Sequence, residues 1–143
     1  MVEEELLSAW IEMSLYIKGN RILSKLSFNE ITIFNYLLKC EKEEIIPSFT
    51  DICNKTKLLK SQINRILGNM EKNGYINKIK DDNDKRKIYI KINKDMLEIY
   101  NQEHKKILVL MSKVCNALGY DKASELAKML HISSKIVDEH KGE

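Results

Sequence analysis

The chain is 143 residues long, enough for one domain with a substantial core, and its 43% hydrophobic and 31% charged residues are typical of soluble globular proteins. No apolar run approaches the roughly 18 residues of a membrane span, and the acidic segment 1–5 is not a signal peptide, so we expect a cytoplasmic protein. The three cysteines, Cys40, Cys53 and Cys115, lie far apart and form no CxxC pair, which argues against a disulfide framework or a zinc knuckle.

Two helices are predicted in the N-terminal part. Residues 3–23 carry apolar side chains at helical spacing, and this apolar set is too wide for one buried stripe. Ser27, followed three residues later by Glu30, is the pattern of a capping box that begins the next helix. That helix should end near Cys40 and bury the stripe Ile31, Phe34, Leu37 and Leu38. The connector 43–46 could pair as a short strand with a later hairpin.

A helix, a turn and a second helix are predicted next. Ser48 is suited to cap a short helix over about 49–55. After the turn, a longer helix should run over about 60–73 and bury the stripe Ile63, Ile66, Leu67 and Met70. Gly74 suits the left-handed residue that often follows a helix.

From residue 75 the apolar period changes to two. Apolar and lysine residues alternate within 75–80 and 87–92, as in half-buried strands, and the polar stretch between them is typical of a hairpin loop. Two C-terminal helices should follow.

Asn93 can cap the first of these two helices, over about 94–118, which Gly119 ends. Asp121 should cap the last helix, over about 122–139. The residues of that helix expected to face inward are Ala123, Leu126, Ala127, Leu130 and Ile136.

Positive charge is concentrated around the predicted hairpin. Residues 54–94 hold twelve Lys or Arg and four Asp or Glu, a local excess of +8, whereas the whole chain carries +3 and the remainder −5. A basic block in a nearly balanced chain is typical of a surface that binds nucleic-acid phosphate. A solvated lysine-rich face would explain the lysines, but it would not explain the order of helix, turn, helix and hairpin.

The element order and several motifs resemble the MarR family of winged helix-turn-helix transcriptional regulators. The matching motifs are Leu26-Ser27, Ile63-Asn64-Arg65-Ile66-Leu67, Met70-Glu71-Lys72-Asn73-Gly74-Tyr75-Ile76 and Asp84-Lys85-Arg86. The resemblance implies a mostly α fold with a small β-hairpin wing, in one domain over 1–143. The winged-helix part would span about 27–93, and dimerisation helices would span about 3–23 and 94–140. Asn93 stands where the family often has threonine, and asparagine caps equally well.

The helix at 60–73 would present polar residues to DNA on its outward arc. Gln or Asn can pair with adenine, and Arg with guanine, through two hydrogen bonds, which supply about 1–3 kcal/mol of base discrimination. Each of these positions could equally be a solvated one, because many contacts in such interfaces go to phosphate. The DNA-binding candidates on this helix are Lys60, Ser61, Gln62, Asn64, Arg65 and Asn69.

The hairpin tip supplies further DNA-binding candidates. In the resemblance Arg86 reaches into the minor groove, while Asp84 holds it or the loop through an ion pair. The alternative is an ordinary surface ion pair, worth about 0–1 kcal/mol. The candidates for phosphate contacts are Lys78, Lys80, Lys85 and Lys87, together with Lys60 at the start of the helix.

The chain ends carry apolar surface suited to a homodimer, which would read two half-sites about one helical turn apart. The interface candidates are Leu6, Leu7, Trp10, Ile11, Leu110, Met111, Leu118, Leu126, Met129 and Leu130. The alternative is that these residues only complete the core of the monomer.

Sensor sites are weaker expectations. The resemblance implies a small-molecule effector in a crevice lined by Trp10, Met13, Tyr16 and Phe34, but such residues are more often plain core, which we favour. Cys40 is the best-placed cysteine for redox sensing because two lysines flank it, although a structural role is favoured there too; Cys53 and Cys115 should be buried. The histidines lack ligand spacing, so no metal or cofactor is expected.

We therefore expect a sequence-specific transcriptional regulator, a repressor that binds an inverted repeat in double-stranded DNA as a homodimer. One alternative is a winged-helix interaction protein that binds a protein partner, and another is a DNA-binding protein of plasmid or phage maintenance. The sequence holds no GxSxG, P-loop or HExxH motif, so we expect no enzymatic activity.

Overall fold

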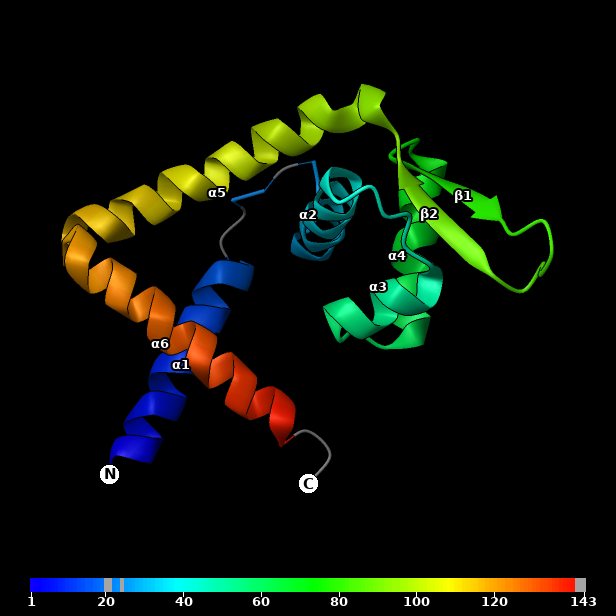
Figure 1. Cartoon of the computed structure of the whole chain (residues 1–143). Helices are drawn as coiled ribbons and strands as arrows, with labels where there is room; N and C mark the ends of the chain where they lie inside the picture. The colour runs from blue at the N-terminus through cyan, green and yellow to red at the C-terminus, as the bar shows by residue number, and fades with distance from the viewer. Residues whose placement is uncertain (20–21, 24, 141–143) are drawn as a thin grey trace. The chain divides into compact units, whose positions relative to one another are not determined.

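A computed structural model describes all residues except 20, 21, 24 and 141–143, and the chain forms two compact units, Met1–His104 and Lys105–Glu143. The first unit holds α1 (Val2–Gly19), α2 (Phe28–Lys42), α3 (Phe49–Thr56), α4 (Lys60–Lys72), β1 (Ile76–Lys80), β2 (Ile88–Ile92), the 3-10 turn η1 (Lys94–Met96) and the start of α5 (Leu97–Leu118) (Figure 1). The second holds the rest of α5 and α6 (Tyr120–Glu139). The predicted mostly α fold with one β-hairpin is confirmed.

The first helix is shorter than predicted. It ends at Gly19, and residues 22 and 23 are not helical, so the predicted end at residue 23 is wrong; positions 20 and 21 lie outside the described residues. Glycine is a poor helix former, which explains an end at this position. No side chain of α1 is buried within the chain.

The predicted capping box begins α2. The N–H of Glu30 donates to Ser27 Oγ at 3.1 Å, and the N–H of Ser27 donates to Glu30 Oε1 at 3.0 Å. The predicted stripe is wrong in one position, because Leu38 is only half-buried whereas Ile33 is fully buried. Contacts with α3, α4 and β2 cover α2 from several sides, so its buried face is wider than one stripe.

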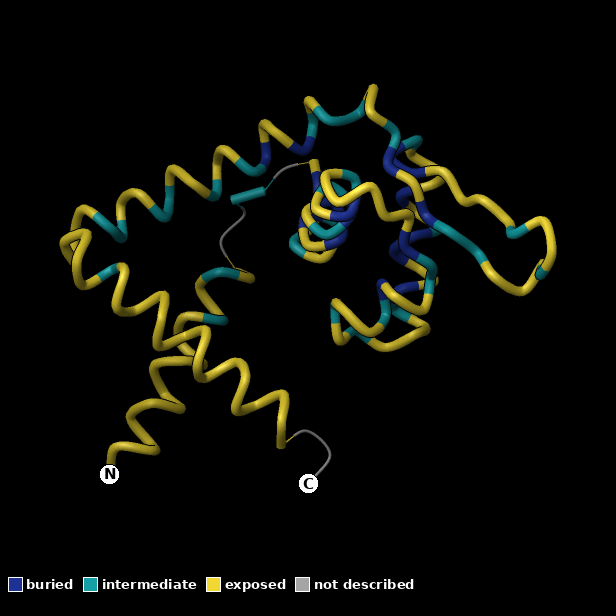
Figure 2. Tube along the Cα trace, in the orientation of Figure 1, coloured by how far each residue is buried: buried dark blue, intermediate teal, exposed yellow. Residues whose placement is uncertain are grey.

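The core of the first unit lies where α2, α3, α4 and the hairpin meet, and Figure 2 shows the buried positions gathered in these elements. Phe34 is fully buried, with ring centroids 5.7 Å from Tyr75 and 5.5 Å from Tyr100. The predicted stripe of α4 is confirmed, since Ile63, Leu67 and Met70 are 0% exposed and Ile66 is 6% exposed.

The predicted strand at 43–46 does not form. The residues that pair with β2 are the next two in the chain, Pro47 and Ser48. The N–H of Ile90 donates to the carbonyl of Pro47 at 2.9 Å, and Ser48 forms a β-bridge with Tyr89. The earlier residues instead end α2: the N–H of Ile45 donates to the carbonyl of Cys40, and Glu44 has a φ of 57°. A left-handed residue interrupts the extended backbone that a strand requires.

The end of α4 leads directly into the hairpin. Gly74 has a φ of 79°, its N–H donates to the carbonyl of Glu71, and the N–H of Tyr75 donates to the carbonyl of Met70. This pair of bonds is a Schellman motif, and it confirms the predicted left-handed glycine.

Strands β1 and β2 then pair antiparallel, with Ile76 opposite Ile92 and Lys80 opposite Ile88. Asn93 joins the two ends of the hairpin, because its N–H donates to the carbonyl of Tyr75 at 2.9 Å and its Nδ2 donates to the carbonyl of Gly74 at 2.8 Å. Its Oδ1 also accepts from the N–H of Asp95 at 3.2 Å, so Asn93 caps the 3-10 turn η1. The predicted start of the long helix at residue 94 is wrong, because α5 begins at Leu97.

In the second unit α6 begins at Tyr120, earlier than predicted. Gly119, with a φ of 87°, is its N-cap, so the predicted cap at Asp121 is wrong and Asp121 lies in the first turn. The predicted inward face is also wrong for the single chain, because no residue of α6 is buried and Leu126, Leu130 and Ile136 are 37%, 59% and 51% exposed. Figure 2 shows exposed positions along nearly all of this helix.

Glu103 on α5 is a buried charged residue in the first unit. It is 0% exposed, and its Oε2 accepts hydrogen bonds from the N–H of Lys25 at 3.2 Å and the N–H of Leu26 at 3.5 Å. The carboxylate therefore holds α5 to the backbone segment that enters α2.

We predict that Glu103→Ala lowers the free energy of unfolding by about 1–3 kcal/mol, because the buried N–H of Leu26 and the part-buried N–H of Lys25 lose their acceptor. Urea unfolding at fixed protein concentration measures the change. Glu98→Ala, at an exposed position of the same helix, should change it by less than about 0.5 kcal/mol. Equal losses for the two variants would contradict the role assigned to Glu103.

Candidate nucleic-acid interface

The outward arc of α4 carries the predicted polar residues. Lys60, Ser61, Asn64, Arg65 and Asn69 are exposed, as the buried stripe on the opposite side requires. Their placement agrees with the expectation, although their contact with DNA stays a prediction.

Gln62 differs from the other candidates on α4. It is half-buried, and its Oε1 accepts a hydrogen bond from the N–H of Leu59 at 3.0 Å. Leucine has no side-chain acceptor, so Gln62 supplies the only side-chain bond described at this helix start. The amide of Gln62 is thus partly engaged inside the protein.

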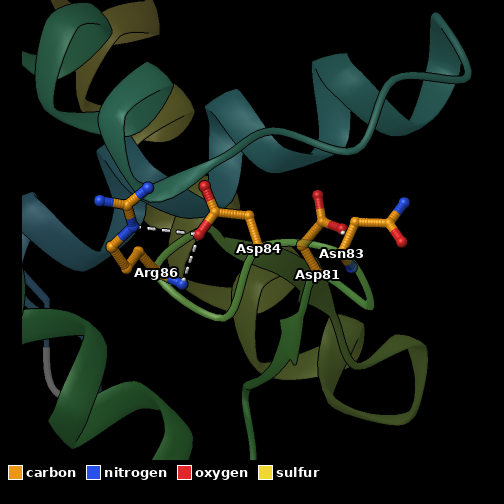
Figure 3. A network of polar contacts seen from close by, with 4 residues as sticks. All are labelled: Asp81, Asn83, Asp84 and Arg86. Carbon is orange, nitrogen blue, oxygen red and sulfur yellow. Dashed lines mark hydrogen bonds and ion pairs between the residues drawn. The ribbon is translucent and has the colours of Figure 1, made fainter.

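The hairpin tip is organised by two aspartates (Figure 3). Asp84 Oδ1 accepts from the backbone N–H of Arg86 at 3.0 Å and from its Nε at 3.2 Å. Asp81 Oδ1 accepts from the backbone N–H of Asn83 at 2.9 Å. A turn in which an aspartate side chain accepts a hydrogen bond from the backbone N–H two residues later is common in loops. Two such turns follow one another at this hairpin tip.

The ion pair predicted between Asp84 and Arg86 is therefore present. The Arg86 side chain is nevertheless 92% exposed, whereas the Asp84 side chain is 33% exposed. The guanidinium keeps its other nitrogens for an external anion while the Nε contact limits its orientation.

Asp81 anchors the start of the same loop. The N–H of Asn83 is the main cause that lowers the pKa of the Asp81 carboxyl below its ordinary value of 3.8, with smaller contributions from the backbone of Asp84 and the hydroxyl of Tyr89. Tyr89 Oη lies 3.4 Å from Asp81 Oδ2. The carboxylate is thus charged throughout the neutral pH range and accepts these bonds there.

A groove of about 600 Å³ lies between the start of α3, the first half of α4 and β2 with the adjoining loop. Its lining residues are Ser48, Phe49, Thr50, Asp51, Lys60, Asn64, Arg86, Lys87, Ile88 and Tyr89. The lining holds three cations, Lys60, Arg86 and Lys87, and one carboxylate, Asp51, whose Oδ2 accepts from the N–H of Ser48. This composition suits a phosphate backbone lying between α4 and the hairpin.

The groove brings α4 and wing candidates together, and it adds residues that the sequence did not indicate. Ser48 was expected only as a helix cap, and Thr50 and Tyr89 had no assigned role. The signal that could have located them is the order of the elements, because the Pro47–Ile90 bond places the start of α3 beside the wing.

The lysine candidates of the wing are not equivalent. Lys78 Nζ lies 3.7 Å from Glu71 Oε1, so part of its charge is balanced within the protein. Lys80, Lys85 and Lys87 are exposed.

The apolar candidates for dimerisation are largely uncovered within the chain. On α1, Leu6, Leu7, Trp10 and Ile11 are 48–68% exposed. Leu110 and Met111 on α5 are half-buried, and Leu118, Leu126, Met129 and Leu130 are 37–59% exposed. The role of these residues in a dimer interface stays a prediction.

The four residues of the predicted effector crevice have different surroundings. Phe34 is enclosed by Tyr75 and Tyr100 in the core, while Trp10, Met13 and Tyr16 on α1 are 67%, 48% and 62% exposed. The core interpretation therefore holds for Phe34 and fails for the three α1 residues. An effector crevice stays a prediction.

The favoured structural role of Cys40 agrees with the structure, whereas the expected burial of Cys53 and Cys115 does not. Cys40 is buried, with 4% of the residue exposed, and it lies beside Tyr36. Burial of the Tyr36 hydroxyl and its hydrogen bond with Cys40 raise the pKa of Tyr36 to about 12. Cys53 and Cys115, expected to be buried, are half-buried. A sensor thiol needs exposure, so Cys40 is a structural residue.

In the part of the chain that the structure describes, no three His, Cys, Asp or Glu side chains are grouped to hold a metal ion. Among the same residues, no helix combines the length and apolar character needed to cross a membrane.

Comparisons with known proteins agree with this geometry. The profile of the family described as "Transcriptional regulator SarA/Rot" matches residues 20–106. Over 90 residues the chain is 27% identical to the HTH-type transcriptional regulator FarR of Neisseria gonorrhoeae. The matched residues make up 63% of this chain. The match spans 62% of the length of that relative.

Two solved structures show the fold. The PcaV transcriptional regulator from Streptomyces coelicolor in complex with its natural ligand has a TM-score of 0.72 and 15% identity, over 90% of this chain and 89% of that chain. A mutant MarR from E. coli complexed with operator DNA has a TM-score of 0.72 and 17% identity, over 92% of this chain and 95% of that chain. The fold is thus the winged helix of MarR-type regulators, as the sequence resemblance implies. Because the family profile matches more than half of its residues, the chain belongs to the SarA/Rot family of transcriptional regulators.

Proposed function

We propose that this chain is a transcriptional repressor that binds an inverted repeat in double-stranded DNA as a homodimer, with α4 in the major groove and the wing at the minor groove. The observation that carries the proposal is the cationic groove, where Lys60 of α4 and Arg86 of the wing line one concave surface. Family membership supports a role in transcription, and such a role belongs to the cytoplasm and needs no catalysis.

The positions of the polar and charged side chains support separate roles in base contact, phosphate contact and minor-groove contact. Arg65 and Asn64 lie on the exposed arc of α4, where their side chains can reach base edges. Lys60 and Lys87 line the groove and suit phosphate oxygens. Arg86, oriented by Asp84, suits a narrow minor groove, whose negative potential attracts a guanidinium.

The homodimer is supported by the apolar faces of α1 and α6, neither of which buries a residue within the chain. Helices of about this length with several exposed leucines are stable in water when a partner covers them. A second copy would also supply the second recognition helix that an inverted repeat requires.

One prediction of the proposed function concerns which DNA sequence the protein selects. Selection from random-sequence duplexes should enrich an inverted repeat whose half-sites lie about one helical turn apart. Arg65→Ala should weaken binding to that site by about 1–3 kcal/mol and relax the preference at one position in each half-site. Lys39→Ala, an exposed cation on α2, is the control for loss of one charge. If no sequence is enriched over the random pool, the proposed function fails.

A second prediction separates charge from positioning in the wing. Arg86→Ala should lower operator affinity by about 1–3 kcal/mol. Asp84→Asn should also lower it, by several-fold, because Arg86 loses its carboxylate partner. Asp82→Asn removes the same charge from an exposed neighbour and should bind equally or more tightly, since less negative charge faces the phosphates. The operator affinities of the three variants and the parent are measured at one salt concentration. Tighter binding by Asp84→Asn than by the parent would contradict the role of Asp84 in orienting Arg86.

A third prediction concerns assembly. Leu130→Asp should raise the dissociation constant of the dimer at least about tenfold, because a charge would enter an apolar interface. Analytical ultracentrifugation measures it, with Ser124→Asp on the same helix as control. A parent protein that sediments as a monomer at micromolar concentration would refute the dimer.

A further inference from the structure

Leu59 occupies the N-cap of α4, yet 69% of this residue is exposed. N-cap positions favour Ser, Thr, Asp or Asn, because these side chains accept a hydrogen bond from an N–H of the first turn. Leucine cannot accept one, and the bond from the N–H of Leu59 to Gln62 satisfies Leu59 itself and gives the first-turn N–H groups no side-chain acceptor. The chain therefore has a poor capping residue and an exposed apolar group at the same position.

Packing of the helix start does not account for this leucine. An apolar residue just before the N-cap often packs on the fourth helical residue, and these positions are Leu58, which is half-buried, and Ile63, which is fully buried. Leu59 is a third apolar residue, beyond that pair, and it has little burial of its own.

Its surroundings are those of a DNA-reading surface. Lys57, Lys60 and Ser61 on either side are exposed, and Lys60 lines the groove shared with the wing. In helix-turn-helix proteins the N-terminal end of the recognition helix is the part that contacts base edges. The thymine 5-methyl is the apolar group that bases present in the major groove.

We infer that Leu59 contacts a thymine 5-methyl group in the major groove and so selects a T·A pair at one position in each half-site. This inference rests on the proposed function and names one determinant of its specificity. Leucine is suited to the contact because both groups are apolar and leave water together.

The test replaces single thymines of the selected operator by deoxyuridine, which pairs identically and lacks only the methyl group. For the parent protein, one position per half-site should lose about fourfold in affinity, the effect of one buried methyl group. Leu59→Ala should bind the thymine operator more weakly and should no longer distinguish deoxyuridine at that position. Ile46→Ala, which alters an exposed apolar residue outside α4, should keep the discrimination.

A second variant separates base contact from helix stability. Leu59→Ser provides a better N-cap, so its melting temperature should equal or exceed that of the parent, and it should lose the same thymine discrimination. Deoxyuridine replacements that leave parent binding unchanged at every position would overturn the inference, as would equal discrimination by the parent, Leu59→Ala and Leu59→Ser. Either result, obtained on an enriched operator, leaves the proposed function standing, whereas failure to enrich any sequence refutes both.

Discussion

Burial of one apolar stripe on α4 is the constraint on which the rest of the site depends. Ile63, Leu67 and Met70 are inaccessible to solvent, and they fix the rotation of the helix about its own axis. With 3.6 residues per turn, that rotation decides which side chains face outward. Arg65 and Asn69 are exposed because their neighbours are buried. The Schellman turn at Gly74 then fixes where the chain leaves the helix and where the wing begins.

Most of the fold could be predicted from the sequence, because local signals and the global pattern agreed. The capping pattern at Ser27, the stripe of α4 and the left-handed Gly74 are encoded within a few residues of where they act. The errors arose where tertiary contacts decide. Pairing of Pro47 with Ile90 depends on residues far apart in the chain, and the exposure of α6 depends on what covers the helix outside a single chain.

The candidate site was only partly predictable for the same reason. Side chains on α4 and the link between Asp84 and Arg86 follow from periodicity and from short-range turn chemistry. The contribution of Thr50 and Tyr89 to the groove could not be read from spacing, since three separate elements must meet to form it. The use of Gln62 within its own helix was also missed, because the same amide suits a base and a backbone N–H equally well.

That use of Gln62 limits how the protein can change its DNA preference during evolution. If Gln62 contacts a base as proposed, a substitution at position 62 would change that contact and, at the same time, release the N–H of Leu59 from its acceptor. Among the hydrogen bonds described, the side chains at positions 61, 64, 65 and 69 make none within the protein, so these positions can vary with less effect on the fold. Divergence of operator specificity among descendants of this chain should therefore accumulate at those four positions before it reaches Gln62.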